Sequence, residues 1–308
     1  MRRPARPGIT WWKNCAGKNN EEEKDMIVSA LKIRSFHAGG AHEIRLPNGN
    51  VILIDPFFRD SENEEHNREE IKRVDYILVT HTHFDHEIDL GYFVEKFRPK
   101  VFAGALSAMA LMKYHRIPFD DLYPVFPGQK FTLEDFTLEA WQAKHNPSGG
   151  RIYSPEQDIA KKELGIEGHF ECDTMGSIES LDYLITTNQN FRCLMASGQT
   201  VWSDLFDISR EKRPNVVLRQ AGVRKSGGDL FSDGQVEAGE LAQLFVKYGA
   251  QVVVPFHMDV LCRRWGKEKT ADYFMQVKEE MEKLEPGCTL LYPEAWKWYG
   301  LGIGITEE

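Results

Sequence analysis

The run from His81 to His86, with the letters HTHFDH, places three imidazoles and one carboxylate within six residues. These side chains are common ligands of divalent metal ions. The run follows Tyr76–Thr80, an apolar segment that predicts a buried strand. A tight loop after such a strand can direct all four groups to one side. The first two histidines would then bind one ion, and the aspartate and last histidine a second ion nearby.

Four further segments predict strands that end in a polar residue. They are Val51–Asp55, Leu138–His145, Leu194–Thr200 and Val252–His257. Each has an ordinary interpretation of its own, as a turn-capping aspartate, a surface histidine or a glycine-containing turn. Their order along the chain, taken with the HTHFDH run, indicates that several strand ends contribute to one centre.

With these motifs the chain resembles the metallo-β-lactamase superfamily over about residues 31–300. Four segments narrow the resemblance, namely 35–40 (SFHAGG), 51–57 (VILIDPF), 197–204 (SGQTVWSD) and 253–259 (VVPFHMD). They look like the branch that contains bacterial L-ascorbate-6-phosphate lactonases and related metal-dependent hydrolases. The resemblance implies an α/β fold, a four-layer αββα sandwich, with a metal site at one edge of its two sheets.

The same resemblance implies a role for each site residue. The first ion would be bound by His81, His83 and His145, and the second by Asp85, His86 and His257. Asp55 would accept a hydrogen bond from a ligand histidine and so orient its ring. Asp85 would also serve as the catalytic base and proton shuttle. One or two divalent ions are expected, with zinc or manganese ahead of iron.

Gln199 departs from the family pattern, which has a bridging aspartate at this position. Two dications close together repel each other, and a neutral amide offsets that repulsion less than a carboxylate. Three outcomes follow: a one-ion enzyme, a two-ion enzyme bridged by hydroxide or substrate, or a metal- or ligand-binding protein with weakened or lost hydrolysis. Asp204 could replace the carboxylate, but a helix-start role is the better interpretation of this residue.

The implied activity is hydrolysis of a small ester, lactone or phosphate-bearing substrate by metal-activated water. Arg224 and Lys225, in a glycine-rich loop, could bind an anionic substrate group, with a solvated turn as the alternative. Residues 146–176 could form a lid that carries Tyr153 and His169 over the site. The alternative is a loop on the protein surface.

The overall composition fits a single α/β domain over residues 31–308, preceded by a polar arm at 1–30. The 308 residues are 42% hydrophobic, and no segment is long and apolar enough to span a membrane. A net charge of −9 disfavours nucleic-acid partners. Five scattered cysteines indicate a reducing cytoplasm. The expected partner is a small molecule, and the arm could also support a homo-oligomer.

Hydrophobic periodicity predicts the elements that must position these residues. Strands are expected at 31–36, 42–46, 51–55, 76–80, 100–104, 136–143, 181–187, 191–196, 214–219 and 251–255. Helices are expected at 87–97, 105–114, 235–248 and 268–284. Asn48 and Gly49 predict a hairpin turn between the second and third strands.

Overall fold

The computed structural model describes residues 30–37, 39–58, 66–145, 169–199, 203–221, 224–225, 228–229, 237–302 and 304–305. Of the expected arm at 1–30, only Ala30 falls within these ranges. Of the expected lid at 146–176, only the stretch from His169 onward is described. Both segments therefore remain predictions.

Within the described ranges, eight strands form the first sheet, in the order β17-β16-β1-β2-β3-β4-β5-β6. Their bounds are β1 Leu31–Ser35, β2 His42–Arg45, β3 Val51–Ile54, β4 Tyr76–Leu78, β5 Lys100–Gly104, β6 Leu122–Val125, β16 Tyr299–Gly302 and β17 Gly304–Ile305. β2 and β3 are antiparallel and are joined at Gly49, whose φ of +87° suits glycine. β3 and β4 are parallel, so their carboxyl ends lie at one edge.

The second sheet has seven strands among the same residues, in the order β15-β14-β11-β10-β9-β8-β7. They are β7 Lys130–Thr132, β8 Phe136–Gln142, β9 Leu181–Thr187, β10 Arg192–Ala196, β11 Val216–Gln220, β14 Val252–Phe256 and β15 Thr289–Leu290. β9 is antiparallel to β8 and to β10, while β10, β11 and β14 are parallel. The carboxyl ends of β8, β10 and β14 therefore meet at one edge of this sheet.

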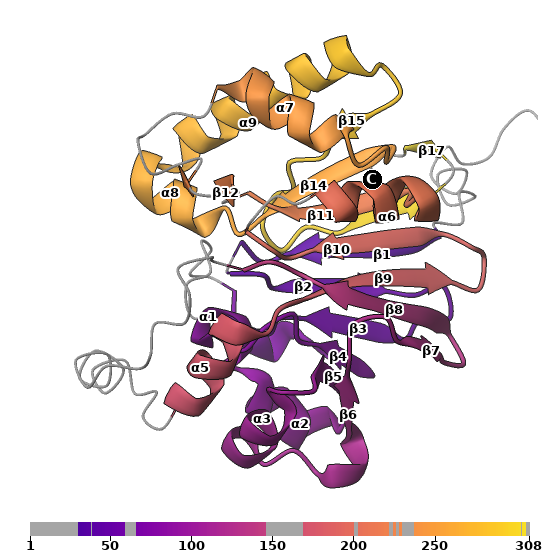
Figure 1. Cartoon of the computed structure of the whole chain (residues 1–308), viewed down its shortest axis with the longest axis vertical. Coiled ribbons are helices and arrows are strands. Elements are labelled where there is room, and N and C mark those ends of the chain that lie inside the picture. Colours follow the sequence, from indigo (N-terminus) through magenta and orange to yellow (C-terminus); the bar gives the residue numbers. More distant parts are fainter. Residues whose placement is uncertain are drawn as a thin grey trace, which may run out of the picture.

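Helices cover the outer face of each sheet, which gives four layers (Figure 1). The described helices are α1 Phe84–Glu87, α2 Leu90–Phe97, α3 Ala108–His115, α5 Phe170–Ile178, α6 Ser203–Lys212, α7 Ala238–Val246, α8 Asp259–Trp265 and α9 Lys267–Leu284. In Figure 1, α2 and α3 lie below the first sheet, and α7 and α9 lie above the second. The expected αββα sandwich is confirmed.

The inner faces of the two sheets share one apolar core. Ile52, Leu78 and Phe102 of the first sheet and Leu138 and Leu218 of the second are completely buried in it. Separate apolar clusters lie beneath α2 and α3 and beneath α7 and α9. Burial of both faces of each sheet explains why these strands read as continuous apolar runs.

Every strand expected from the sequence is present, within two residues of its predicted bounds. The helix expected at 87–97 is instead split into α1 and α2. Asp89, between them, has non-helical backbone angles, and its carboxylate accepts a hydrogen bond from the Phe58 amide at 2.8 Å. That bond ties the break to the loop after β3, so the tertiary contact overrides the helical periodicity.

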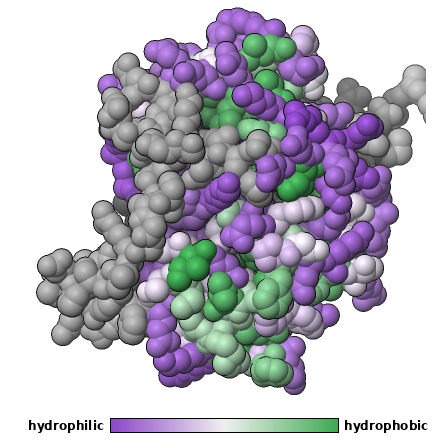
Figure 2. Space-filling view, in the orientation of Figure 1, coloured by the Kyte–Doolittle hydropathy of each residue, from purple (hydrophilic) through white to green (hydrophobic). Residues whose placement is uncertain are grey.

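None of the helices in the described ranges combines the length and the apolar character that crossing a bilayer requires. Figure 2 shows apolar side chains gathered in the lower part of one face, where α2, α3 and α5 lie in Figure 1. Leu106 and Met109, around the start of α3, are among the exposed apolar side chains.

Candidate metal centre

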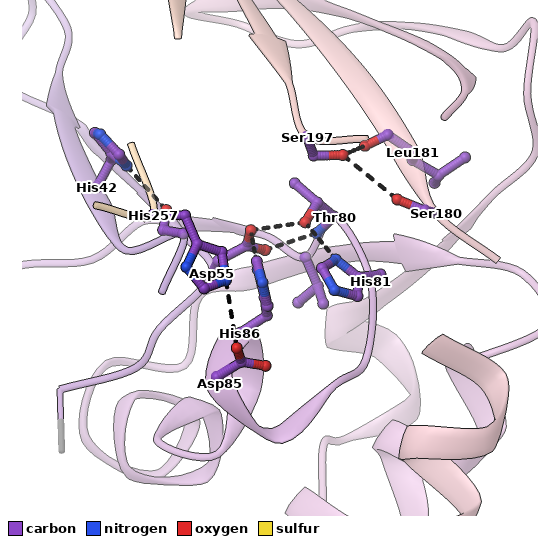
Figure 3. A network of polar contacts seen from close by, with 12 residues as sticks. His42, Asp55, Thr80, His81, Asp85, His86, Ser180, Leu181, Ser197 and His257 are labelled. Carbon is purple, nitrogen blue, oxygen red and sulfur yellow. Dashed lines mark hydrogen bonds and ion pairs between the residues drawn. The ribbon is translucent and has the colours of Figure 1, made fainter. Parts of the chain in front are cut away.

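Two groups of metal-binding side chains lie together at the edge where the strands end. Figure 3 shows His81 near Asp85, His86 and His257. The first is His81, His83 and His145, and the second is Asp85, His86 and His257. Within each group the ligand atoms lie within 4.8 Å of one another. The rings of the first and last histidines of the HTHFDH run are 3.8 Å apart between centroids, which joins the groups into one centre. The structure thus brings together all six predicted ligands.

The segment from the end of β4 through α1 supplies four of these ligands, and its geometry depends on Asp55. This carboxylate is completely buried after β3, and it accepts hydrogen bonds from the amide and the hydroxyl of Thr80, both at 2.7 Å. Its Oδ2 also lies 2.8 Å from Nδ1 of His86. Asp55 thus holds the start of the loop and one ligand ring at once, as predicted for an orienting residue.

These hydrogen bonds determine which ring nitrogen of each histidine is available. The Thr80 hydroxyl donates to Asp55, so its oxygen accepts from Nδ1 of His81, 3.1 Å away. The lone pair of His81 is then on Nε2, a buried atom without a hydrogen-bond partner among the described residues. By the same argument, His86 donates from Nδ1 to Asp55 and keeps its lone pair on Nε2.

His83 is oriented by helix α5 from the other side of the loop. The hydroxyl of Ser177 donates to the Asp173 carbonyl at 3.1 Å and lies 3.0 Å from Nε2 of His83. The hydroxyl oxygen accepts from Nε2, which leaves the lone pair on Nδ1. Gly176 allows this close packing, because a Cβ there would lie 2.7 Å from the His83 amide nitrogen.

His257 comes from the second sheet, directly after β14. Its Nδ1 lies 2.7 Å from Asp259 Oδ1, and its Nε2 lies 3.3 Å from Asp85 Oδ2. Burial acts to lower the pKa of His257, but the two carboxylates outweigh it and raise the pKa to about 10. The imidazole therefore carries a proton that a bound cation would displace.

The charges of the other ligands also suit a divalent ion. Burial lowers the pKa of His81 and His145, and neighbouring histidines lower it further, so both rings are neutral at neutral pH. Burial acts to raise the pKa of Asp85, but His86 and His257 outweigh it and hold the carboxyl well below its usual pKa. Neutral imidazoles and an ionised carboxylate are the ligand forms that Zn²⁺, Mn²⁺ and Fe²⁺ bind.

Gln199 lies on a turn that packs against the backbone before His145. A Cβ on the preceding Gly198 would lie 2.8 Å from the Lys144 carbonyl oxygen. The completely buried Arg219 donates from Nη1 to the carbonyls of Ala196 and Gly198, at 2.9 and 2.5 Å, and so holds this turn. Gln199 Oε1 is buried without a hydrogen-bond partner among the described residues, which fits a neutral oxygen ligand.

One predicted substrate contact needs correction. His169 is completely buried, and its Nε2 contacts the carboxylate of Glu87 on α1. A ring with no exposed surface cannot meet a substrate, so its position behind the ligand loop excludes the role predicted for it. The surrounding residues Cys172 and Asp173 belong to α5, the helix that buttresses His83.

The other predicted residues away from the ligand cluster lie as follows. Tyr153 lies outside the described residues, and Arg224 and Lys225 form the short strand β12, paired with β13 at Gly228–Asp229, without described side chains. Asp204 is exposed in the first turn of α6, as expected of a helix-start residue.

Three positioning residues were not assigned a role from the sequence: Thr80, Ser177 and Asp259. Thr80 and Asp259 stand one residue before His81 and two after His257, so their place beside predicted ligands could have indicated them. Ser177 is distant in sequence from His83, and no sequence pattern connects the two. Its contact depends on how α5 packs against the loop.

Comparison with known proteins agrees with this geometry. A model of the metallo-β-lactamase superfamily matches residues 41–160, which include Asp55, the HTHFDH run and His145. Igni18, a metallo hydrolase from Ignicoccus hospitalis, aligns with 87% of this chain and 97% of its own chain, at a TM-score of 0.60 and 14% identity. The chain is therefore similar to the metallo-β-lactamase superfamily over residues 41–160.

Curated relatives match this chain over part of their length. A UPF0173 metal-dependent hydrolase from Thermodesulfovibrio yellowstonii is 33% identical over 102 residues, which are 30% of this chain and 38% of the relative. Exodeoxyribonuclease WalJ from Streptococcus pneumoniae is 26% identical over 163 residues, or 49% of this chain and 60% of the relative. The chain thus spans 38 to 60% of these relatives. These similarities describe the fold and leave the substrate of this chain to be inferred from the site.

Proposed function

We propose that this protein is a metal-dependent hydrolase that acts on a small ester, lactone or phosphate-bearing substrate. One observation carries the proposal: six metal-ligand side chains form two adjoining groups at the edge of the two sheets. Hydrogen bonds that the histidine rings donate to Thr80, Asp55 and Ser177 direct the ring lone pairs. The curated relative from Thermodesulfovibrio yellowstonii, named a metal-dependent hydrolase, supports the same class.

A divalent ion in this site would supply an activated water and an electrophilic centre for the substrate oxygen. His81, His83 and His145 would hold the first ion, and Asp85, His86 and His257 the second. Asp85 is the candidate base and proton shuttle, because it is ionised and lies within 3.3 Å of His257 Nε2. Zinc and manganese are the first candidates, with iron as the third.

The test is turnover of generic substrates by protein loaded with each metal in turn. A lactone, a carboxylic ester and a phosphodiester should be assayed with Zn²⁺, Mn²⁺ and Fe²⁺, and turnover of at least one is expected. His81→Ala should abolish it, while Asp204→Asn, at an exposed position on α6, serves as the matched control. Full turnover by His81→Ala would disprove the assignment.

A second candidate is a metal- or ligand-binding protein with weakened or lost hydrolysis. The neutral Gln199, at the position of the bridging aspartate, favours it. Metal binding without turnover of any substrate by any metal form would support this candidate over the hydrolase.

We also infer a small-molecule substrate rather than a nucleic acid, and a cytoplasmic location. The net charge of −9 opposes binding to a phosphate backbone, and the scattered cysteines fit a reducing compartment. The name of the pneumococcal relative makes DNA a necessary further substrate in the assay. Cleavage of DNA ahead of the small substrates would overturn this inference. Sedimentation of the full chain tests the proposed homo-oligomer.

A further inference from the structure

A second cluster of ligand-type side chains lies behind the metal centre, between α1 and α5. A carboxylate oxygen of Glu87, a ring nitrogen of His169 and the sulfur of Cys172 lie within 4.8 Å of one another. The relative exposures of these residues are 0%, 0% and 1%. An anionic carboxylate is costly at such depth unless a cation or several donors compensate for it.

The orientation of His115, a neighbour of this cluster, shows that its ring does not bind an ion there. The amide of Gly91 donates to Nδ1 of His115 at 3.1 Å, so the hydrogen of this imidazole is on Nε2. That nitrogen contacts one oxygen of Glu87 and donates to it. His115 therefore orients the carboxylate as a neutral donor, and it has no lone pair left for a metal.

His169 is placed between two carboxylates. Its Nε2 contacts the second oxygen of Glu87, and its Nδ1 lies 3.1 Å from Asp173 Oδ1. An ion bound by Nε2, the nitrogen beside Glu87, leaves Nδ1 facing the Asp173 carboxylate. Ligand histidines in metal sites usually have such a partner, because it fixes the tautomer and makes the ring more basic.

We propose that Glu87, His169 and Cys172 bind a further divalent ion of the zinc class, separate from the catalytic centre. The thiolate and the carboxylate neutralise the two charges of the ion, and a thiolate ligand selects zinc over manganese. A water molecule completes a tetrahedral set with these three side chains.

The position of this site gives the ion a structural role. Glu87 is the last residue of α1, directly after the ligand His86, and the other two ligands are on the first turn of α5 and its N-cap. The Thr82 hydroxyl donates to the Cys172 carbonyl at 2.6 Å, and Ser177 contacts His83. An ion here joins α5 to the loop that carries four of the six catalytic-centre ligands.

Cobalt substitution tests the proposal on the intact wild-type chain. The six residues of the main centre contain no sulfur, so a thiolate-to-cobalt charge-transfer absorption reports only a cysteine-containing site. We expect this absorption in the wild type and in His81→Ala, and its loss in Cys172→Ser. Cys262→Ala, on α8, is the matched control and should retain it. Absence of the absorption from the wild type, or its survival in Cys172→Ser, would overturn the proposal.

Metal counting gives an independent readout. Elemental analysis should find one zinc fewer per chain in His169→Gln than in wild type, with the main-centre ions retained. If Cys172→Ser or His169→Gln fails to fold, X-ray absorption of the wild-type zinc protein still decides, because it detects a sulfur ligand directly. A zinc spectrum with nitrogen and oxygen ligands alone would show that Glu87 is held by its two histidines without an ion.

Discussion

The metal centre depends on hydrogen bonds that choose one nitrogen of each ring. Thr80 accepts from His81 only because its own proton goes to Asp55. Replacing Thr80 by alanine leaves the hydrogen of His81 no longer fixed on Nδ1. We expect metal affinity to fall about 10- to 100-fold, the usual effect of losing such a partner. Competition with a chromogenic chelator measures the change. Thr80→Ser keeps the hydroxyl and should bind within a few-fold of wild type; equal affinity of the alanine variant would refute the role.

Gln199 sets the charge of the second ion site. Gln199→Asp supplies the anion that the amide lacks, and we expect the affinity for the second ion to rise by about tenfold or more, because an added charge within a few ångströms of a dication contributes on the order of kcal/mol. Calorimetric metal titration measures it. Gln199→Glu tests whether side-chain length matters as well as charge, and Gln199→Asn should give no increase in affinity for the second ion. An unchanged isotherm for Gln199→Asp would show that this position does not contact the ions.

His42 on β2 links folding to pH. Its burial lowers the pKa to about 4, whereas in the unfolded chain the ordinary value is 6.5. The unfolded state therefore takes up a proton first, and stability contributed by neutral His42 is complete above pH 6.5 and is lost as pH falls to about 4. We expect the unfolding free energy of wild type, relative to His42→Asn, to fall by on the order of 3 kcal/mol across this window. Urea titrations at several pH values measure this change. Equal pH dependence of the unfolding free energy in wild type and His42→Asn would contradict the role of His42.

Helix α5 is the element whose packing most directly shapes the ligand loop. Gly176→Ala improves helix propensity but places a Cβ 2.7 Å from the His83 amide nitrogen. We expect a net loss of about 1–3 kcal/mol in stability, together with weaker metal binding, because overpacking outweighs propensity here. Gly239→Ala on α7 meets nothing within 4 Å and should gain up to about 1 kcal/mol. Chemical denaturation of both variants compares them, and a stabilised Gly176→Ala would contradict the packing.

At the element scale the sequence predicted strands better than helices. The strands are buried on both faces and read as unbroken apolar runs such as 252–254 (VVV), so periodicity found them. It did not find α5, which has only a weak apolar stripe and is held by contacts of Thr82 and Ser177. The six ligands could be predicted because each follows one of these apolar strands. The contact of Ser177 and the Glu87 cluster could not be predicted, because both depend on tertiary packing.

At the scale of the whole molecule, the metal ligands connect the two sheets. His81 follows β4 of the first sheet, whereas His145 and His257 follow β8 and β14 of the second. We expect chelation with EDTA to lower the thermal midpoint by several degrees, because an ion at about 100 times its Kd stabilises the folded state by about 2.7 kcal/mol. Differential scanning calorimetry measures the shift. His81→Ala should respond less to EDTA, and an equal shift in both proteins would assign the effect to another ion.

The spread of the ligands along the chain has a consequence for biosynthesis. The three-histidine group is complete in sequence once His145 has been translated, whereas the second group lacks His257 until most of the chain has left the ribosome. We therefore expect metal loading to follow the order of translation. The first ion can join while the second sheet is still growing, and the second can join only after β14 has taken its place in that sheet.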